Sequence, residues 1–348
     1  MENKKILIIK PSSLGDIIHA MPCALAIKKT FVNARISWLV KKEFAFILEG
    51  MPELEEIIVW DYQRWRTGNI FSKLSYILEM RKQLQAKRFD LVLDLQGLFK
   101  STLLALLTSC SQKYVYSDAR EGSAVFSKRI VGENAQAHVV QRYLDVVRYL
   151  GVQIVEPEFY LPITSKARDM VANLLTQQGI KDFVVLLPAT RLETKEWLLE
   201  RYAQLAERLL NKGDNVLIVG SNADSSKADY IVSHSKSENN TGKILDMTGK
   251  TDLKELMAVL EKANVVIGGD TGPLHMAVAA GSKVIGLFGQ REPFRSGPYG
   301  ASNISIWKPP SCAPCRKKVC ADLLCMKAID VDDVWTAYQT LNSHIEEK

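Results

Sequence analysis

Unbroken apolar runs and amphipathic stretches alternate along most of the chain. In the first half the apolar runs lie at residues 5–10, 34–40, 56–60 and 90–95, with helical patterns between them. Such runs are typical of strands buried on both faces of a parallel sheet. The amphipathic segment 140–151 ends at Gly151, a residue type common just beyond a helix. The pattern predicts a doubly wound α/β domain.

A second series of the same kind begins at Asp182. Its predicted strands lie at 183–188, 215–220, 243–248, 264–269 and 283–289, and its predicted helices at 197–210, 225–234, 253–263 and 273–281. Segment 155–167 contains two prolines and no periodicity, which indicates a linker. We expect an N-terminal domain at 1–155, a linker and start of the second domain at 156–181, a second domain at 182–330 and a C-terminal helix at 331–348.

Composition and charge agree with this two-domain reading. The chain has 348 residues, of which 47% are hydrophobic and 24% charged, as in a globular protein. It has no run long enough for a spanning helix, and the first apolar stretch is interrupted by Lys10 and Asp16, so we expect a cytoplasmic protein without a signal peptide. The net charge of +6 is a mild bias, and no run of basic and aromatic residues suggests nucleic-acid binding.

The segment GGDTGPLHMAVAAG, residues 268–281, indicates an anion site at the start of a helix. Pro273 fits the first helical turn, which places Thr271 and Gly272 at the N-terminus, where unpaired N–H groups and the helix dipole attract anions. Asp270 would lie beside that site and His275 one turn along. A pyrophosphate is the natural ligand; the alternative is a well-capped helix that binds nothing.

Two other loops of the second domain carry polar residues at the same sheet edge. Thr190 and Lys195 follow the strand at 183–188, and a lysine beside a helix N-terminus would complete a diphosphate site. Asp224 follows the strand at 215–220, where a carboxylate can bind ribose hydroxyls. The alternatives are a solvated lysine and an aspartate that only caps the next helix.

Ser13 and Asp16 follow the first strand and fit a capping box, with Ser13 as N-cap. Capping alone would explain both residues. Asp16 would also lie at the carboxyl edge of the first sheet, and we expect that edge to face the diphosphate site across a cleft between the two domains. The helix dipole favours an ionised carboxylate, as a general base requires, so Asp16 is a candidate catalytic base.

The segments KPSSLGDIIHAMP, DLQGLFKS, TKEW and GGDTGPLHMAVAAG, in this order, resemble the ADP-heptose:lipopolysaccharide heptosyltransferases of glycosyltransferase family 9. DLQGLFKS and DAREG are more similar to heptosyltransferase I than to heptosyltransferase II, and the resemblance covers nearly the whole chain. It implies the GT-B fold, with two Rossmann-like domains facing a central cleft. It also implies inverting transfer of L-glycero-D-manno-heptose from ADP-heptose to a Kdo residue of lipid A, in lipopolysaccharide inner-core biosynthesis.

The resemblance also implies roles for individual residues. Asp16 matches the family's catalytic base. The residues that match its donor-binding positions are Thr190, Lys195, Asp224, Asp270, Thr271, Gly272 and His275. Asp224 stands where a relative has a glutamate, and Ala189 where a relative has a second threonine. Segments similar to the acceptor side contain Ser13, Arg64, Arg66, Lys100 and Arg120, whose cations suit an anionic acceptor. The acceptor implies peripheral contact with the cytoplasmic face of the inner membrane, and catalysis is expected to need no cofactor.

Four cysteines crowd into the segment from Cys312 through Cys315 and Cys320 to Cys325. Their spacing suits structural zinc or an iron–sulfur cluster, and reduced structural thiols are an equal alternative. We expect no active-site metal. Three other functions stay open: a family 9 transferase with another donor or acceptor, a nucleotide-sugar-binding module without turnover, and a nicotinamide-dependent oxidoreductase. The missing G-x-G-x-x-G motif argues against the last.

Overall fold

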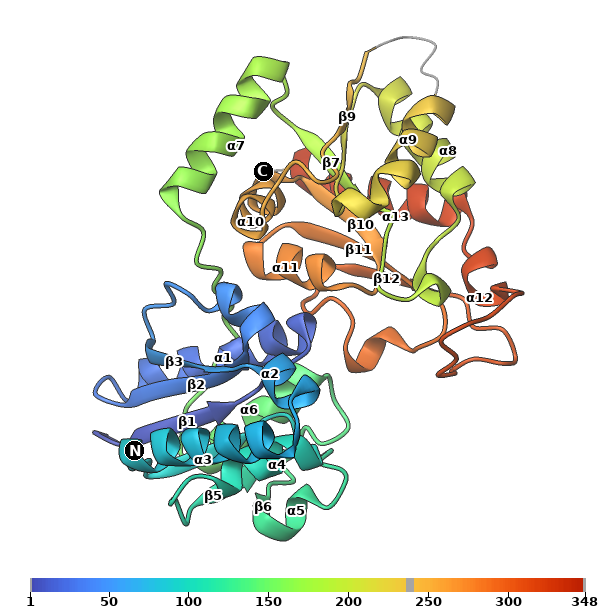
Figure 1. The fold of residues 1–348 in the computed structure, drawn as a ribbon. Helices are drawn as coiled ribbons and strands as arrows, with labels where there is room; N and C mark the ends of the chain where they lie inside the picture. Colours follow the sequence, from blue (N-terminus) through green and yellow to red (C-terminus); the bar gives the residue numbers. More distant parts are fainter. Residues whose placement is uncertain (1, 236–240, 347–348) are drawn as a thin grey trace. The chain divides into compact units, whose positions relative to one another are not determined.

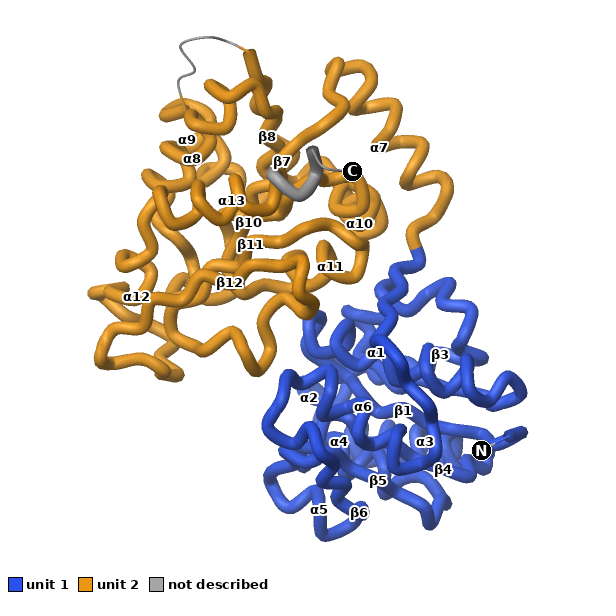
Figure 2. The backbone as a smooth tube through the Cα atoms, turned by 180° about the vertical axis from the view of Figure 1, so that it is seen from behind, with its two compact units in different colours: residues 1–162 blue, residues 163–348 orange. Residues whose placement is uncertain are grey.

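A computed structural model of the chain describes residues 2–235 and 241–346. The chain divides into two compact units, residues 1–162 and 163–348 (Figure 2). Among the described helices, none combines the length and the apolar character that crossing a membrane requires.

Unit 1 is built on a six-stranded sheet in the order β3-β2-β1-β4-β5-β6, and all of its paired strands run parallel (Figure 1). The central strands are buried apolar runs because helices cover both faces of the sheet. The strands are β1 (Lys5–Ile9), β2 (Arg35–Lys41), β3 (Leu54–Trp60), β4 (Leu91–Asp94), β5 (Lys113–Val115) and β6 (Lys128–Arg129).

Helices α1 and α6 pack together on one face of this sheet, whereas α3 and α4 close a core on the other face. That core contains Leu7, Val92, Tyr76, Met80 and Leu104, all buried. The helices are α1 (Leu14–Thr30), α2 (Tyr62–Thr67), α3 (Ile70–Lys87), α4 (Phe99–Leu106), α5 (Ser123–Phe126) and α6 (Val139–Tyr149), with a 3-10 helix η1 (Lys42–Ile47).

Unit 2 has a second parallel six-stranded sheet, in the order β12-β11-β10-β7-β8-β9. Its strands are β7 (Phe183–Leu187), β8 (Asn215–Ile218), β9 (Ile244–Asp246), β10 (Val265–Gly269), β11 (Lys283–Phe288) and β12 (Ile304–Trp307). The helices are α7 (Ser165–Gln178), α8 (Leu199–Lys212), α9 (Ser225–His234), α10 (Leu253–Lys262), α11 (Gly272–Ala280), α12 (Leu324–Lys327) and α13 (Val331–Glu346), with η2 (Glu193–Lys195), η3 (Asn222–Asp224) and η4 (Pro293–Arg295).

The predicted strands of both halves are present, which confirms the α/β class with two parallel sheets. Helix α7 begins at Ser165, within the segment 156–181 that we expected to contain the linker and the start of the second domain. Thr164 caps this helix by accepting a hydrogen bond from the Ala167 N–H at 3.2 Å. The last two residues of the predicted C-terminal helix, 347–348, lie outside the described residues.

Each sheet order reverses direction once, between β1 and β4 in unit 1 and between β7 and β10 in unit 2. At such a switch point the loops beyond the carboxyl ends of the two strands diverge to opposite faces, which leaves room for a ligand. The loop before α1 lies at the first switch point, and the loops before η2 and α11 lie at the second.

Candidate functional site

The candidate base Asp16 lies in the first turn of α1, at the switch point of unit 1. Its Oδ2 accepts hydrogen bonds from the Ser13 N–H at 3.0 Å and from the Ser13 hydroxyl at 2.7 Å. The Ser12 N–H donates to Oε1 of Gln96 at 3.3 Å, which joins this turn to the loop after β4. The predicted capping box is therefore present, and it holds a half-buried carboxylate at the sheet edge.

Lys10 places a buried amine beside this turn, although in the sequence it only interrupts an apolar run. Its Nζ donates to the Leu95 carbonyl at 2.9 Å and to the Tyr143 hydroxyl at 2.7 Å. Burial lowers the pKa of Lys10, and the charges of Asp16 and Asp94 act in the opposite direction. A lysine at the end of a fully buried strand is the sequence signal that would have found it.

Asp94 ends β4 and is buried completely. Its carboxylate accepts hydrogen bonds from the backbone N–H groups of Gln96 and Gly97, both at 3.0 Å, and from the Ser101 hydroxyl at 2.9 Å. Burial raises the pKa of Asp94 to about 6 despite these three donors. This network fixes the turn that leads into α4.

The residues predicted for the acceptor side all lie in unit 1, and three of the four cations already have partners. Arg64 pairs with Glu79 at 3.0 Å, Arg120 pairs with Asp118 at 3.0 Å, and Lys100 donates to the Tyr62 hydroxyl at 2.8 Å. Arg66 is exposed on α2. These are surface interactions, which an anionic ligand can displace at little cost.

In unit 2 the structure brings Lys195, Asp270 and His275 together. The Lys195 Nζ lies 2.5 Å from Oδ2 of Asp270, and the His275 Nε2 lies 3.4 Å from its Oδ1. Burial by itself would raise the pKa of Asp270, but the hydrogen bond with His275 and the charge of Lys195 outweigh burial and hold that pKa well below its usual range. The carboxylate therefore stays ionised and fixes both partners at the switch point.

Helix α11 begins next to this triad. Thr271 is its N-cap, Gly272 its first residue, and Pro273 lies in the first turn as predicted. The N-terminal N–H groups and the helix dipole give this end a positive potential, and Lys195 adds a cation whose charge the Asp270 carboxylate partly offsets. The three elements together favour a diphosphate.

Gly269 allows the loop after β7 to approach β10 closely. A Cβ at this position would lie 2.5 Å from the Lys195 carbonyl oxygen and 2.9 Å from Cγ2 of Thr190. The Thr190 hydroxyl donates to the Leu192 carbonyl at 2.7 Å, so this side chain shapes its own loop. The absence of a side chain at Gly269 thus brings Thr190 and Lys195 to the start of α11.

Asp224 forms a second capping turn, at the carboxyl end of β8. Its Oδ2 accepts from the Ser221 N–H at 2.9 Å and from the Ser221 hydroxyl at 2.6 Å, as Asp16 does from Ser13. Since β8 neighbours β7, this turn lies one strand away from the switch point. These bonds cap the 3-10 helix η3, whereas in α9, the helix that Asp224 was expected to cap, its side chain makes no capping hydrogen bond.

Glu196 was not singled out from the sequence, although it lies in the TKEW segment. Its Oε1 accepts from the Thr190 N–H at 3.0 Å and from the Lys227 Nζ at 2.6 Å. This links the loop after β7 to helix α9. Lys227 gave no sequence signal, because it reaches Glu196 only through the tertiary fold.

All four clustered cysteines line one cavity of about 160 Å³, together with Thr194 and Gln290. Within residues 2–235 and 241–346 no group of three or more metal-ligating side chains is placed so that it could hold a metal ion. The segment instead contacts the donor loop. The Cys315 N–H donates to the Gln290 carbonyl at 2.7 Å, and the Gln290 amide donates to the Thr194 hydroxyl at 3.1 Å.

Comparison with known proteins places these features in one family. Residues 77–325 match the profile of glycosyltransferase family 9 (heptosyltransferase). The lipopolysaccharide core heptosyltransferase OpsX of Haemophilus influenzae is 27% identical over 85% of this chain and 82% of its own. The lipopolysaccharide heptosyltransferase 1 of Pseudomonas aeruginosa is 27% identical over 91% of this chain and 87% of its own.

A solved structure of the E. coli heptosyltransferase WaaC with ADP-2-deoxy-2-fluoro heptose matches 97% of this chain and 99% of its own, with a TM-score of 0.73 and 24% identity. This similarity confirms the predicted GT-B fold. The family profile covers more than half of the chain and includes the loops of both switch points except the turn at Asp16. The chain therefore belongs to glycosyltransferase family 9 (heptosyltransferase), and it is a glycosyltransferase related to the heptosyltransferases of lipopolysaccharide core biosynthesis.

Proposed function

We propose that this enzyme transfers heptose from ADP-L-glycero-D-manno-heptose to a Kdo residue of lipid A, with inversion at the anomeric carbon. The observation that carries the proposal is the triad of Lys195, Asp270 and His275 beside the N-terminus of α11. It combines a cation with a helix dipole where a nucleotide diphosphate would bind. The relative solved with an ADP-heptose analogue supports the choice of donor.

In the proposed reaction Asp16 takes the proton from the acceptor hydroxyl as its oxygen attacks the anomeric carbon. The bond between that carbon and the donor phosphate oxygen breaks, and ADP leaves with the electron pair. Lys195 and the N–H groups at Thr271 and Gly272 stabilise the charge that grows on the diphosphate. Asp224 would bind the ribose, and Thr190 would lie beside the phosphates.

The acceptor is proposed to bind to unit 1, beside Ser13 and the cations Arg64, Arg66, Lys100 and Arg120. Kdo carries a carboxylate and lipid A carries phosphates, so cations on this unit suit such an acceptor. The acceptor would be reached from the cytoplasmic face of the inner membrane by peripheral contact. No cofactor is included in the proposal.

The test is ADP release from a panel of nucleotide sugars, measured with a Kdo-bearing lipid A acceptor and with none. We expect ADP-heptose with the acceptor to give the highest kcat/KM, and we expect full activity in excess EDTA. A higher kcat/KM with another nucleotide sugar would show that ADP-heptose is not the donor. Loss of activity in EDTA that magnesium restores would contradict the metal-free mechanism. Binding of ADP-heptose without any ADP release would leave only a binding module.

A further inference from the structure

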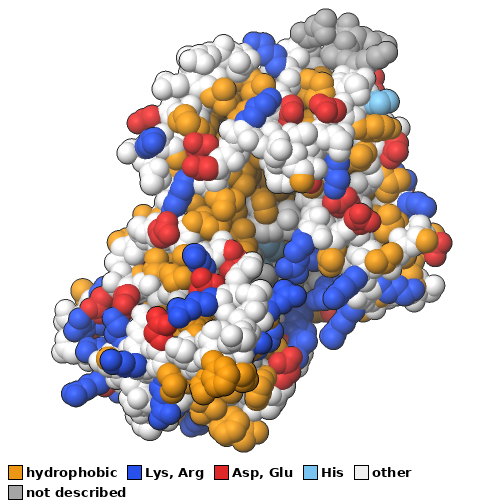
Figure 3. Space-filling view, in the orientation of Figure 1, with side chains coloured by type: hydrophobic (Ala, Val, Ile, Leu, Met, Phe, Trp, Pro, Cys, Tyr) orange, Lys and Arg blue, Asp and Glu red, His pale blue; other side chains and the backbone are white. Residues whose placement is uncertain are grey.

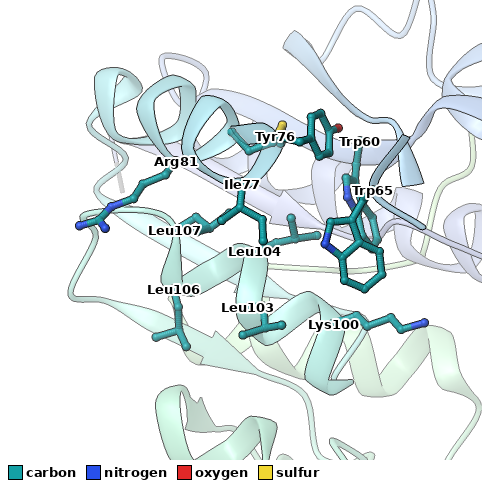
Figure 4. Close-up of a pocket in the computed structure, with 11 residues that line it drawn as sticks. Trp60, Trp65, Tyr76, Ile77, Arg81, Lys100, Leu103, Leu104, Leu106 and Leu107 are labelled. Carbon is teal, nitrogen blue, oxygen red and sulfur yellow. The ribbon is translucent and has the colours of Figure 1, made fainter. Parts of the chain in front are cut away.

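Helices α3 and α4 flank a pocket of about 330 Å³ in unit 1 (Figure 4). Buried core side chains of β3, α3 and α4 form its floor: Trp60, Tyr76, Met80 and Leu104. A volume of this size lies within the range of about 300–1,000 Å³ that small-molecule sites occupy. The lining is mostly apolar, so a polar sugar or nucleotide would lose much of its hydration there with few partners to replace it.

The apolar character continues from the pocket onto the surface. Each flanking helix exposes an apolar stripe at helical spacing: Ile70, Phe71, Leu74 and Leu78 on α3, and Phe99, Leu103 and Leu106 on α4. Figure 3 shows apolar side chains gathered over α4 on this unit, with lysine and arginine side chains near them. Contiguous exposed apolar surface of this kind marks an interaction site.

A cation lies at each end of the pocket, Lys100 beside Trp65 and Arg81 at the opposite end (Figure 4). The Lys100 Nζ is 4.8 Å from the centre of the Tyr62 ring, and the Lys41 Nζ is 4.3 Å from the same centre. Lys41 also lies 3.7 Å from Glu43. An anion bound beside this ring would therefore meet two cations. An apolar pocket with cations at its ends matches an amphiphile with an anionic head.

The Lys100 end of the pocket adjoins the switch point of unit 1. Lys100 lies in the first turn of α4, directly after the loop that follows β4. Gln96 in that loop accepts a hydrogen bond from the N–H of Ser12, which lies four residues before Asp16. A ligand with its head at Lys100 would therefore place its polar part on the side of the candidate base and its apolar part between α3 and α4.

We propose that this pocket holds one acyl chain of the lipid acceptor, with an anionic group of the same molecule beside Lys100. The inference rests on the proposed function, since it assigns the acceptor's own lipid to the unit that carries Asp16. The charge at the two ends of the apolar lining argues for this occupant. A phospholipid of the bilayer and a second copy of this chain are the other candidates, and the test separates them.

The kinetic test compares acylated Kdo-lipid A with the deacylated acceptor that keeps its sugars and phosphates. Wild-type enzyme should have the lower KM for the acylated acceptor. Leu103→Gln, at the mouth of the pocket, should raise that KM about fivefold, as expected when one or two methylene groups lose their apolar contact. Its KM for the deacylated acceptor and for ADP-heptose should stay unchanged.

The matched control is Leu253→Gln on unit 2, because Leu253 is 45% exposed and Leu103 is 40% exposed. This control should leave every KM unchanged.

Equal KM values of the wild type for both acceptors, or an equal rise for both in Leu103→Gln, would overturn the proposal. If vesicles of phosphatidylethanolamine and phosphatidylglycerol lower the KM for the deacylated acceptor, the occupant is bilayer lipid and the proposal is wrong. A change in molecular mass on Leu103→Gln, with no change in KM, would identify a contact between two copies and would equally overturn it.

A direct binding measurement separates failure of the pocket from failure of the proposed function. Dodecyl phosphate below its micelle concentration serves as the probe, and tryptophan fluorescence reports its binding. The signal should become smaller in Trp65→Phe, where Trp60 is the remaining tryptophan of the pocket, and the Kd should rise about fivefold in Leu103→Gln. Binding of the probe by an enzyme inactive on every Kdo acceptor would reject the proposed acceptor and its chain, leaving only an amphiphile pocket. Absence of probe binding by an enzyme that uses the Kdo acceptor would reject the pocket alone.

Discussion

Asp16 combines a capping role with a proposed catalytic role, and an amide replacement separates the two. Asp16→Asn keeps an oxygen that can accept the hydrogen bond from the Ser13 N–H, which the carboxylate accepts at 3.0 Å. It cannot take a proton, so kcat should fall roughly a hundredfold to ten-thousandfold, with the ADP-heptose KM nearly unchanged. Steady-state ADP release measures both.

Asp252→Asn is the control for capping. Asp252 caps α10 by accepting from the Lys254 and Glu255 N–H groups, both at 2.8 Å, and it belongs to no proposed site. This variant should lose a little thermal stability and keep its kcat. Near-wild-type turnover in Asp16→Asn would show that Asp16 only caps the helix.

Asp94 makes stability depend on pH in a direction opposite to that of most carboxylates. Its folded pKa of about 6 lies above its usual value of 3.8. Between these values the unfolded chain releases the proton first, so the free energy of unfolding should fall as pH rises from 4 to 6. The change is on the order of 3 kcal/mol. Denaturant unfolding of Asp94→Asn should lack this part of the pH dependence. An identical pH profile in the two proteins would contradict the raised pKa.

At the scale of elements, the close approach of β10 to the donor loop depends on Gly269. In Gly269→Ala the new Cβ would clash with the Lys195 carbonyl oxygen at 2.5 Å and move the loop away from α11. Overpacking of this kind costs about 1–3 kcal/mol, and the ADP-heptose KM should rise severalfold. Kinetics and thermal unfolding measure the two effects.

Gly281→Ala provides the control for strain without loop movement. Gly281 has a φ of +90° and open space around a Cβ, so alanine there is strained but touches nothing. This variant should lose about 1 kcal/mol of stability and keep its donor KM. If both glycine variants change the donor KM equally, loss of stability rather than loop position explains the effect.

The elements were more predictable from sequence than the contacts between them. Buried parallel strands such as β7 and β10 are continuous apolar runs, and the Ser13–Asp16 turn has a recognisable spacing. Helix α7 was not predicted, because the prolines before it dominated the pattern. The short strands β5 and β6 have too few residues for any periodicity.

In the candidate donor site, too, the local elements could be predicted from the sequence and the contacts between them could not. Pro273 and Gly281 mark the two ends of α11 in the sequence, so the position of Thr271 at its start could be predicted. The contact of Lys195 with Asp270 spans 75 residues and depends on the order of strands in the sheet. No local sequence pattern encodes the order of the strands in the sheet. The hydrogen bond between Lys227 and Glu196 could not be predicted for the same reason.

At the scale of the whole molecule, each unit should control the affinity for one substrate. Arg64→Ala combined with Arg120→Ala removes two cations of unit 1, so we expect the acceptor KM to rise severalfold and the ADP-heptose KM to stay constant. Both arginines are about half exposed, with exposed side-chain fractions of 50% and 46%. Added salt should therefore raise the acceptor KM more in the wild type than in the variant.

Arg208→Ala serves as the control, because Arg208 pairs with Asp332 on the surface of unit 2, outside the proposed sites. It should leave both KM values unchanged. Equal loss of affinity for donor and acceptor in the double variant would show that Arg64 and Arg120 support the fold. Unchanged kinetics would make them ordinary surface charges.

The hydrogen bonds from Cys315 through Gln290 to Thr194 connect the cysteine segment to the residue next to Lys195. The handling of the purified enzyme follows from this connection. Oxidation of the cysteine thiols during storage would add oxygen atoms inside a cavity of about 160 Å³ that Thr194 also lines. Aged preparations should therefore weaken in ADP-heptose binding before they lose secondary structure, and a reducing agent that restores the thiols should restore the donor KM.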